Sequence, residues 1–132
     1  MWRLNVRKAY LEKVFEVGKF FLNERHDFQP EEPLLLQIVK QDEPGRILGR
    51  VRGMLLFQKI IEDIANESVE LYGIKWKYAI ISNRVVRLQS KDWFNMEDVI
   101  GNGPAQKYYG QAEAVKLSAE DEVVIREILQ VI

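Results

Sequence analysis

Cysteine is absent from this 132-residue chain, and histidine occurs once, as His26. The absence of cysteine excludes disulfide bonds, thiolate zinc sites and cysteine nucleophiles. A single histidine also argues against a histidine-based metal centre. His26 stands between Arg25 and Asp27, in polar sequence that is typical of a solvated loop. We therefore expect no metal and no resident cofactor.

The chain also lacks a long apolar run and a strong excess of charge. No stretch of about 18 apolar residues occurs, so we expect no membrane-spanning helix. The start of the chain has no apolar core of the kind found in signal peptides, which predicts a cytoplasmic protein. The net charge of -1 argues against coating duplex DNA by bulk electrostatics, but it allows a local basic stripe.

What the chain contains is typical of one globular domain, which we place over residues 1–132. Hydrophobic residues make up 47% of the sequence and charged residues 30%, and the length is sufficient for one buried core. No internal repeat, low-complexity tract or linker divides it.

The first part of the chain predicts two short strands around a helix, and then a third strand. Trp2, Leu4 and Val6 alternate with polar residues, which favours an opening strand. Residues 8–17 have helical spacing, and Gly18 stands where a C-terminal cap belongs. A strand over residues 19–22, a polar loop over 23–33 and a strand over 34–40 complete this part.

The second part is richer in strands. After a turn at residues 41–46, a long strand over 47–61 contains Gly49 and Gly53, which favour bulges. We then expect a short helix that is capped by Asn66 or Ser68 and ends at Gly73. A strand over 74–89, helical turns over 92–100, a strand over 112–117 and a helix from Ser118 follow. Hairpins outnumber parallel crossovers, so we predict an α+β fold with a small, curved, mainly antiparallel barrel and flanking helices.

Residues 100–111 have a composition that favours recognition. Three glycines and a proline allow sharp turns, while tyrosine and amide side chains supply stacking faces and hydrogen bonds. The segment holds no nucleophile–base pair and no metal cluster, so we expect the rim of a binding site. Its candidate binding residues are Asn102, Gln106, Tyr108, Tyr109 and Gln111.

Basic and aromatic residues elsewhere extend this candidate site. Arg50 and Arg52 share one face of the long predicted strand, where they supply either a solvated charged face or a phosphate-binding stripe. Arg25 is a further candidate for a phosphate contact. Trp93 lies in loop-like sequence, where a large ring is less easily explained by core packing.

Catalytic signatures are missing. No nucleophile elbow, P-loop or dinucleotide-binding glycine pattern occurs, and the adjacent acidic pairs are typical of strand faces and helix starts. We therefore predict a binding module rather than an enzyme. Two alternatives stay open. One is a small enzyme acting on a nucleotide-like ligand, and the other is a protein-interaction module or homodimer joined through the edge of the long strand.

The chain resembles the PUA-like superfamily of small pseudobarrels, which includes PUA, ASCH, EVE and YTH domains. The resemblance rests on the order of elements: the opening strand and helix, the strand from Gly18 onward, the long hairpin, the strand that begins near Trp76, and the segment from Gln106 to Gln111 before the last strand and helix. The chain looks closest to EVE-like domains and to small, uncharacterised archaeal stand-alone members. The Gly-x-Lys-x-x-Glu-x-Arg signature of ASCH domains is absent.

This resemblance implies binding of RNA or of a modified nucleobase in a cleft beside the barrel, with an extruded DNA base as a second ligand. In that interpretation Arg25, Arg50 and Arg52 hold phosphates, and Trp93, Tyr108 or Tyr109 stacks on a base. The amides of Asn102, Gln106 and Gln111 read the edge of the base.

Overall fold

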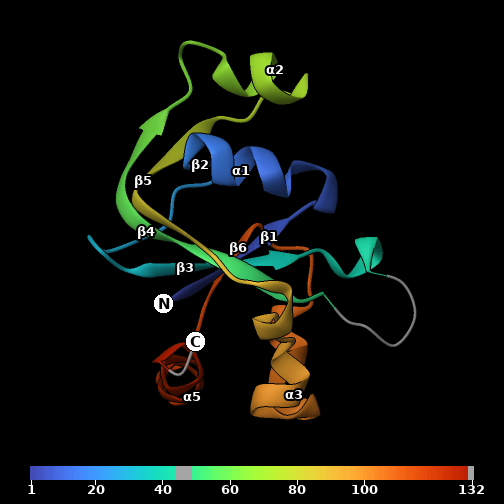
Figure 1. Ribbon diagram of the computed structural model, residues 1–132. Helices are drawn as coiled ribbons and strands as arrows, with labels where there is room; N and C mark the ends of the chain where they lie inside the picture. Colours follow the sequence, from blue (N-terminus) through green and yellow to red (C-terminus); the bar gives the residue numbers. More distant parts are fainter. Residues whose placement is uncertain (44–48, 131–132) are drawn as a thin grey trace.

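Six strands form one curved sheet in the computed structural model, which describes residues 1–43 and 49–130 (Figure 1). The strands are β1 (Trp2–Val6), β2 (Lys19–Leu22), β3 (Pro33–Ile38), β4 (Val51–Glu62), β5 (Tyr78–Arg87) and β6 (Ala114–Lys116). Their order across the sheet is β2-β5-β4-β3-β1-β6, and every neighbouring pair is antiparallel except β1 with β3. The prediction of an α+β fold with a curved, mainly antiparallel sheet is confirmed.

The helices are short and lie at both ends of the sheet, with α1 and α2 at the top of Figure 1 and α3 and α5 at the bottom. The α-helices are α1 (Leu11–Val17), α2 (Glu67–Tyr72), α3 (Met96–Ile100), α4 (Asn102–Ala105) and α5 (Ala119–Gln130). Single 3₁₀ turns are η1 (Lys8–Tyr10), η2 (Lys40–Asp42), η3 (Ser90–Asp92) and η4 (Gln106–Tyr108).

The predicted helix over residues 8–17 is confirmed, with η1 as its first turn. Leu11 and Val14 are buried on one side of α1, as their spacing requires. Gly18 ends the helix with a φ of 65°, a left-handed conformation that glycine adopts without steric cost. The chain can therefore reverse within one residue and enter β2 directly.

The sheet packs apolar side chains on both faces. One cluster includes Leu4, Leu36 and Leu55 and is covered by α1. The other cluster includes Leu35, Met96 and Ile125 and is covered by the helices at the opposite end. The edge strands of the sheet are β2 and β6.

A bulge in β4 confirms the structural role predicted for Gly53. Leu36 pairs with Gly53 and Gln37 pairs with Val51, so one extra residue of β4 is accommodated beside the glycine. A Cβ atom at Gly53 would lie 2.7 Å from the ring of Phe15, and closer still to the carbonyl oxygen of Val86. Glycine therefore lets α1 lie close against the sheet. The rest of the predicted turn and strand start, residues 44–48, lies outside the described residues.

The cap of α2 differs from the prediction. Asn66 occupies the N-cap position, but its side chain makes no capping hydrogen bond. The Asp63 carboxylate instead accepts hydrogen bonds from the backbone N–H groups of Glu67 (2.9 Å) and Ser68 (3.0 Å). Burial alone would raise the pKa of Asp63, but these bonds and that from the Ser68 hydroxyl lower it to about 2. The helix ends at Gly73, as predicted, with a φ of 70°.

The prediction of an irregular loop after residue 100 was wrong in part. Residues 102–108 form α4 and η4, and Gly101 ends α3 with a φ of 91°. The final helix agrees with its predicted start, because the Ser118 hydroxyl accepts a hydrogen bond from the Asp121 N–H at 3.2 Å.

Candidate binding pocket

A pocket opens where the curved sheet fails to close on itself. It lies between the edge strand β2 on one side and the end of β1 with the segment before β6 on the other. Its volume is about 420 Å³ including its open mouth. The Asn23 N–H, just after β2, donates to the Glu113 carboxylate at 2.8 Å, so a hydrogen bond links the two sides.

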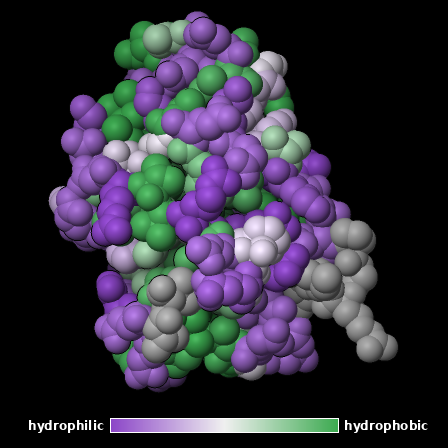
Figure 2. Space-filling model, in the orientation of Figure 1, coloured by the Kyte–Doolittle hydropathy of each residue, from purple (hydrophilic) through white to green (hydrophobic). Residues whose placement is uncertain are grey.

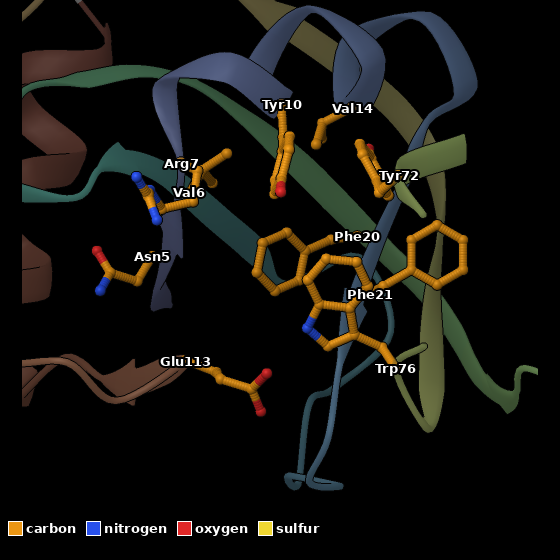
Figure 3. Close-up of a pocket in the computed structure, with 10 residues that line it drawn as sticks. All are labelled: Asn5, Val6, Arg7, Tyr10, Val14, Phe20, Phe21, Tyr72, Trp76 and Glu113. Carbon is orange, nitrogen blue, oxygen red and sulfur yellow. The ribbon is translucent and has the colours of Figure 1, made fainter. Parts of the chain in front are cut away.

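Aromatic rings form one side of the pocket, which we call the aromatic pocket. These rings belong to Tyr10, Phe20, Phe21, Tyr72 and Trp76 (Figure 3). The rings of Tyr72 and Trp76 are 5.6 Å apart at 85°, and those of Tyr10 and Trp76 are 6.2 Å apart at 86°. The rings therefore form a wall with near right-angled corners. A planar ligand that lies flat on one ring meets the next ring edge-on, which is a favourable aromatic geometry.

Polar side chains form the opposite side, and they are Asn5, Arg7 and Glu113 (Figure 3). The Arg7 guanidinium donates to both carboxylate oxygens of Asp42, from Nε at 2.8 Å and from Nη2 at 3.0 Å. Because a guanidinium carries five N–H groups, this bidentate pairing fixes its orientation and leaves donors for a ligand. The Arg7 side chain is 64% exposed.

The Tyr72 hydroxyl is a buried polar group without a hydrogen-bond partner among the described residues. Burial raises the pKa of Tyr72 to about 12, so the hydroxyl remains neutral and able to donate at physiological pH. In Figure 3 the indole nitrogen of Trp76 faces the polar side of the pocket. An unsatisfied buried hydroxyl of this kind costs free energy.

Three of the residues predicted to bind ligand form a cluster of their own. The guanidinium groups of Arg52 and Arg50 lie over the Trp93 ring, at 4.0 Å and 5.0 Å from its centroid. Both also pair with Glu43, Arg52 at 2.9 Å and Arg50 at 3.5 Å. Arg52 and Glu43 are buried. The two arginines are thus neighbours over one ring, and their charge is partly balanced by Glu43.

The two predicted tyrosines have their polar atoms bound by the protein. Tyr108 is fully buried, and its hydroxyl donates to Asp121 at 2.6 Å and accepts from the Ser118 N–H at 3.2 Å. Tyr109 is half-buried, and its hydroxyl accepts from the Glu97 N–H at 3.0 Å. Both rings pack in the core beside α3 and α5, and neither lines the pocket described above.

The remaining predicted residues are exposed. The amide of Gln106 donates back to Asn102 at 2.8 Å, within α4 and η4. Gln111 lines a second, polar pocket beside Asn5 and Arg7. The guanidinium of Arg25 lies 5.3 Å from the centroid of the Tyr78 ring, in the segment that follows β2. Gln111 is therefore the predicted residue whose pocket adjoins the aromatic pocket, through Asn5 and Arg7.

Sequence reasoning missed Tyr10, Tyr72 and Trp76 as a group. They come from η1, the last residue of α2 and the segment before β5, and the curvature of the sheet brings them together. The local signal was limited to an aromatic residue before Gly73 and a tryptophan just ahead of a strand. No sequence spacing joins these positions.

Comparison with known proteins gives a match in structure alone. No family model matches the chain, and no curated protein matches it in sequence. Two crystal structures of the ASCH protein ZmASCH from Zymomonas mobilis have the same arrangement of elements. A point mutant matches with a TM-score of 0.57 and 9% identity, covering 96% of this chain and 96% of that one. The unmutated protein matches with a TM-score of 0.56 and 7% identity, covering 96% and 93%.

The chain shares its fold with these ASCH structures. Its segment after α1 carries Gly18 and Arg25 at the spacing of the first and last residues of the ASCH signature. Phe20 and Asn23 stand where that signature has lysine and glutamate. Phe20 is buried against the aromatic pocket, so at this point the chain presents an apolar ring in place of an ionisable group.

Within residues 1–43 and 49–130, no helix combines the length and the apolar character that crossing a bilayer requires. No group of three or more His, Asp or Glu side chains in the same part of the chain is arranged to hold a metal ion.

Proposed function

We propose that this protein is a nucleic-acid-binding module that holds an unpaired nucleobase in the aromatic pocket. The supporting observation is the wall of Tyr10, Tyr72 and Trp76 around an open pocket. Nucleobases combine a flat π-face with polar edges, and this pocket offers a surface for the first and a donor for the second. Bases of single-stranded RNA are accessible to such a site, as is a modified or extruded base.

In this proposal the base stacks on one of the pocket rings while the neutral Tyr72 hydroxyl donates to an acceptor on its edge. The Glu113 carboxylate lies on the polar side, where it accepts from an amino or imino N–H of the base. Stacking on each ring contributes about 1–3 kcal/mol and accepts any base, so the two polar groups supply the discrimination.

Exposed cations near the pocket provide phosphate contacts. Arg25 and Lys77 both lie against the Tyr78 ring, at 5.3 Å and 5.4 Å from its centroid. Tyr78 begins β5 two residues after Trp76. The pair is available to the backbone that carries the bound base, and we expect its contribution to fall with added salt.

The test is a calorimetric titration of the protein with short single-stranded RNA of random sequence, and then with individual standard and modified nucleosides. We expect saturable binding that is weakened by Tyr72→Phe, which removes only the hydroxyl. Tyr109→Phe is the matched control, because its hydroxyl bonds to Glu97 outside the pocket. Heat signals that are absent for every ligand, or equal losses in both variants, would refute the proposal.

Self-association is a second candidate function, favoured by apolar side chains at the far end of the β4–β5 hairpin. Ile61, Ile64, Val69 and Ile74 are exposed there, and Ile64 is 82% exposed. Figure 2 shows apolar atoms among hydrophilic ones at the top of the molecule, over α2. In the described sheet, residues 53–56 of β4 pair with both β3 and β5, and residues 59–62 pair with β5 alone. Light scattering across a range of concentrations tests this candidate, and a constant monomer mass would exclude it.

A further inference from the structure

The aromatic pocket continues into a second, polar pocket across the end of β1. The polar pocket is lined by Asn5, Arg7, Val39, Gln41 and Gln111, and has a volume of about 620 Å³ including its open mouth. Asn5 and Arg7 line both pockets. The two hollows therefore lie on either side of one pair of side chains.

A second shared wall runs beside that pair. Residues 110–113 place Gln111 in the polar pocket and Glu113 in the aromatic pocket. Asn5 fixes this segment by donating from its backbone N–H to Glu113 O at 2.9 Å and from its side-chain amide to Gly110 O at 3.3 Å. The buried Arg3 guanidinium donates to Ala112 O at 2.6 Å. The pair Asn5 and Arg7 and the segment of residues 110–113 therefore each contribute to both pockets, and hydrogen bonds hold the segment in place.

The two hollows differ in chemistry. The first presents aromatic faces, whereas the second presents two exposed amides, Gln41 and Gln111, which both donate and accept hydrogen bonds. Arg7 stands between them, oriented by Asp42 and 64% exposed. An arginine with free N–H groups at the boundary between two such subsites is placed to contact a phosphodiester.

We propose that the polar pocket is a subsite for the nucleotide that follows or precedes the stacked base, so that the ligand is a dinucleotide segment of single-stranded nucleic acid. This inference rests on the proposed function. The first base stacks in the aromatic pocket, Arg7 donates to the linking phosphate, and Gln41 and Gln111 hydrogen-bond to the edge of the second base. Sequence preference at the second position would then come from amide contacts rather than from stacking.

The experiment compares nucleoside monophosphates with dinucleoside monophosphates as ligands in calorimetric titrations of the full chain. We expect the dinucleotides to bind at least about tenfold more tightly, because the second contact is made within the same ligand. In the double variant Gln41→Ala with Gln111→Ala, this gain should fall to within about twofold while mononucleotide binding is unchanged. Gln106→Ala is the control, since Gln106 is an exposed amide that bonds to Asn102 away from both pockets.

The outcomes separate this inference from the proposed function. Mononucleotide binding that is not improved in any dinucleotide overturns the polar subsite and leaves the aromatic pocket standing. A gain that survives the double variant overturns the assigned role of the two glutamines. Absence of binding for both classes of ligand overturns the proposed function together with the inference.

Discussion

Two groups of aromatic side chains in this protein differ in how their polar atoms are satisfied. In the group beside α3 and α5, the Tyr108 and Tyr109 hydroxyls and the Trp93 indole N–H all bond to protein atoms. In the aromatic pocket, the Tyr72 hydroxyl has no partner among the described residues. Buried polar groups are normally paired, so the unpaired hydroxyl of Tyr72, a residue that lines an open pocket, separates this ring from the packed tyrosines. The comparison predicts that the first group governs stability and the second governs binding.

The largest expected effect concerns the packing group. Tyr108→Ala should lower the free energy of unfolding by about 3–5 kcal/mol, because it empties a fully buried site and leaves Asp121 without its hydroxyl partner. Denaturant unfolding followed by far-UV circular dichroism measures this change. A loss below about 1 kcal/mol would show that the distinction between the two groups is wrong for Tyr108.

The next largest effect concerns the aromatic side chains of the pocket. Trp76→Ala should weaken binding of single-stranded RNA by about 1–3 kcal/mol, since it removes a stacking face. Trp93→Phe provides the comparison, because Trp93 is covered by Arg50 and Arg52 and should leave affinity unchanged. Calorimetric titration of both variants, after their folding has been checked by thermal melts, measures the difference. Equal losses would remove the basis for separating the two groups.

Acid should affect the pocket through α2. The pKa of Asp63 is lowered to about 2, so its contribution to stability is complete above its ordinary value near 3.8 and is lost as the pH falls towards 2. We expect Asp63→Asn to cost up to about 2 kcal/mol at neutral pH and to flatten the stability curve between pH 4 and 2. Chemical unfolding at a series of pH values measures this. An unchanged curve would show that Asp63 does not hold the helix that carries Tyr72.

The smallest effect distinguishes exposed from paired arginines. Arg25→Ala should reduce the slope of log affinity against log salt by about 1, because the Arg25 side chain is exposed and available to a phosphate. Arg52→Lys should leave that slope unchanged, since Arg52 is buried and paired with Glu43. Binding titrations at several salt concentrations compare the two variants. The opposite ranking would favour the arginine stripe predicted from the sequence.

The sequence was sufficient for most of the fold because the local signals agreed with one another. Alternation in β1, the glycine after α1 and the serine before α5 all act over a few residues, and each was predicted. The cap of α2 was harder to predict, because the capping side chain belongs to Asp63, which precedes the usual N-cap position by three residues. Residues 102–108 were misjudged because glycine and proline are common in loops, and here they enter short helical turns instead.

The pocket could not be predicted in the same way. Its aromatic residues meet only because the sheet curls until the segments after β2 and before β6 are hydrogen-bonded through Asn23 and Glu113. A long-range arrangement of this kind depends on the order of strands, which hydrophobic periodicity does not specify. Tyr108 and Tyr72 also look alike in sequence, each next to or near a glycine, and only their partners separate them.

The glycine in β4 has a consequence for the pocket that lies at a distance from it. Because Gly53 has no side chain, the Phe15 ring seats directly on the sheet and α1 is drawn down with it. The same helix carries Val14, and the turn that precedes it carries Tyr10, both of which line the pocket. A methyl group at Gly53 would overlap the Val86 carbonyl oxygen as well as the Phe15 ring, so it would disturb the pairing of β4 with β5 together with the seat of the helix. The position of two residues that line the pocket therefore depends on a glycine that does not line it.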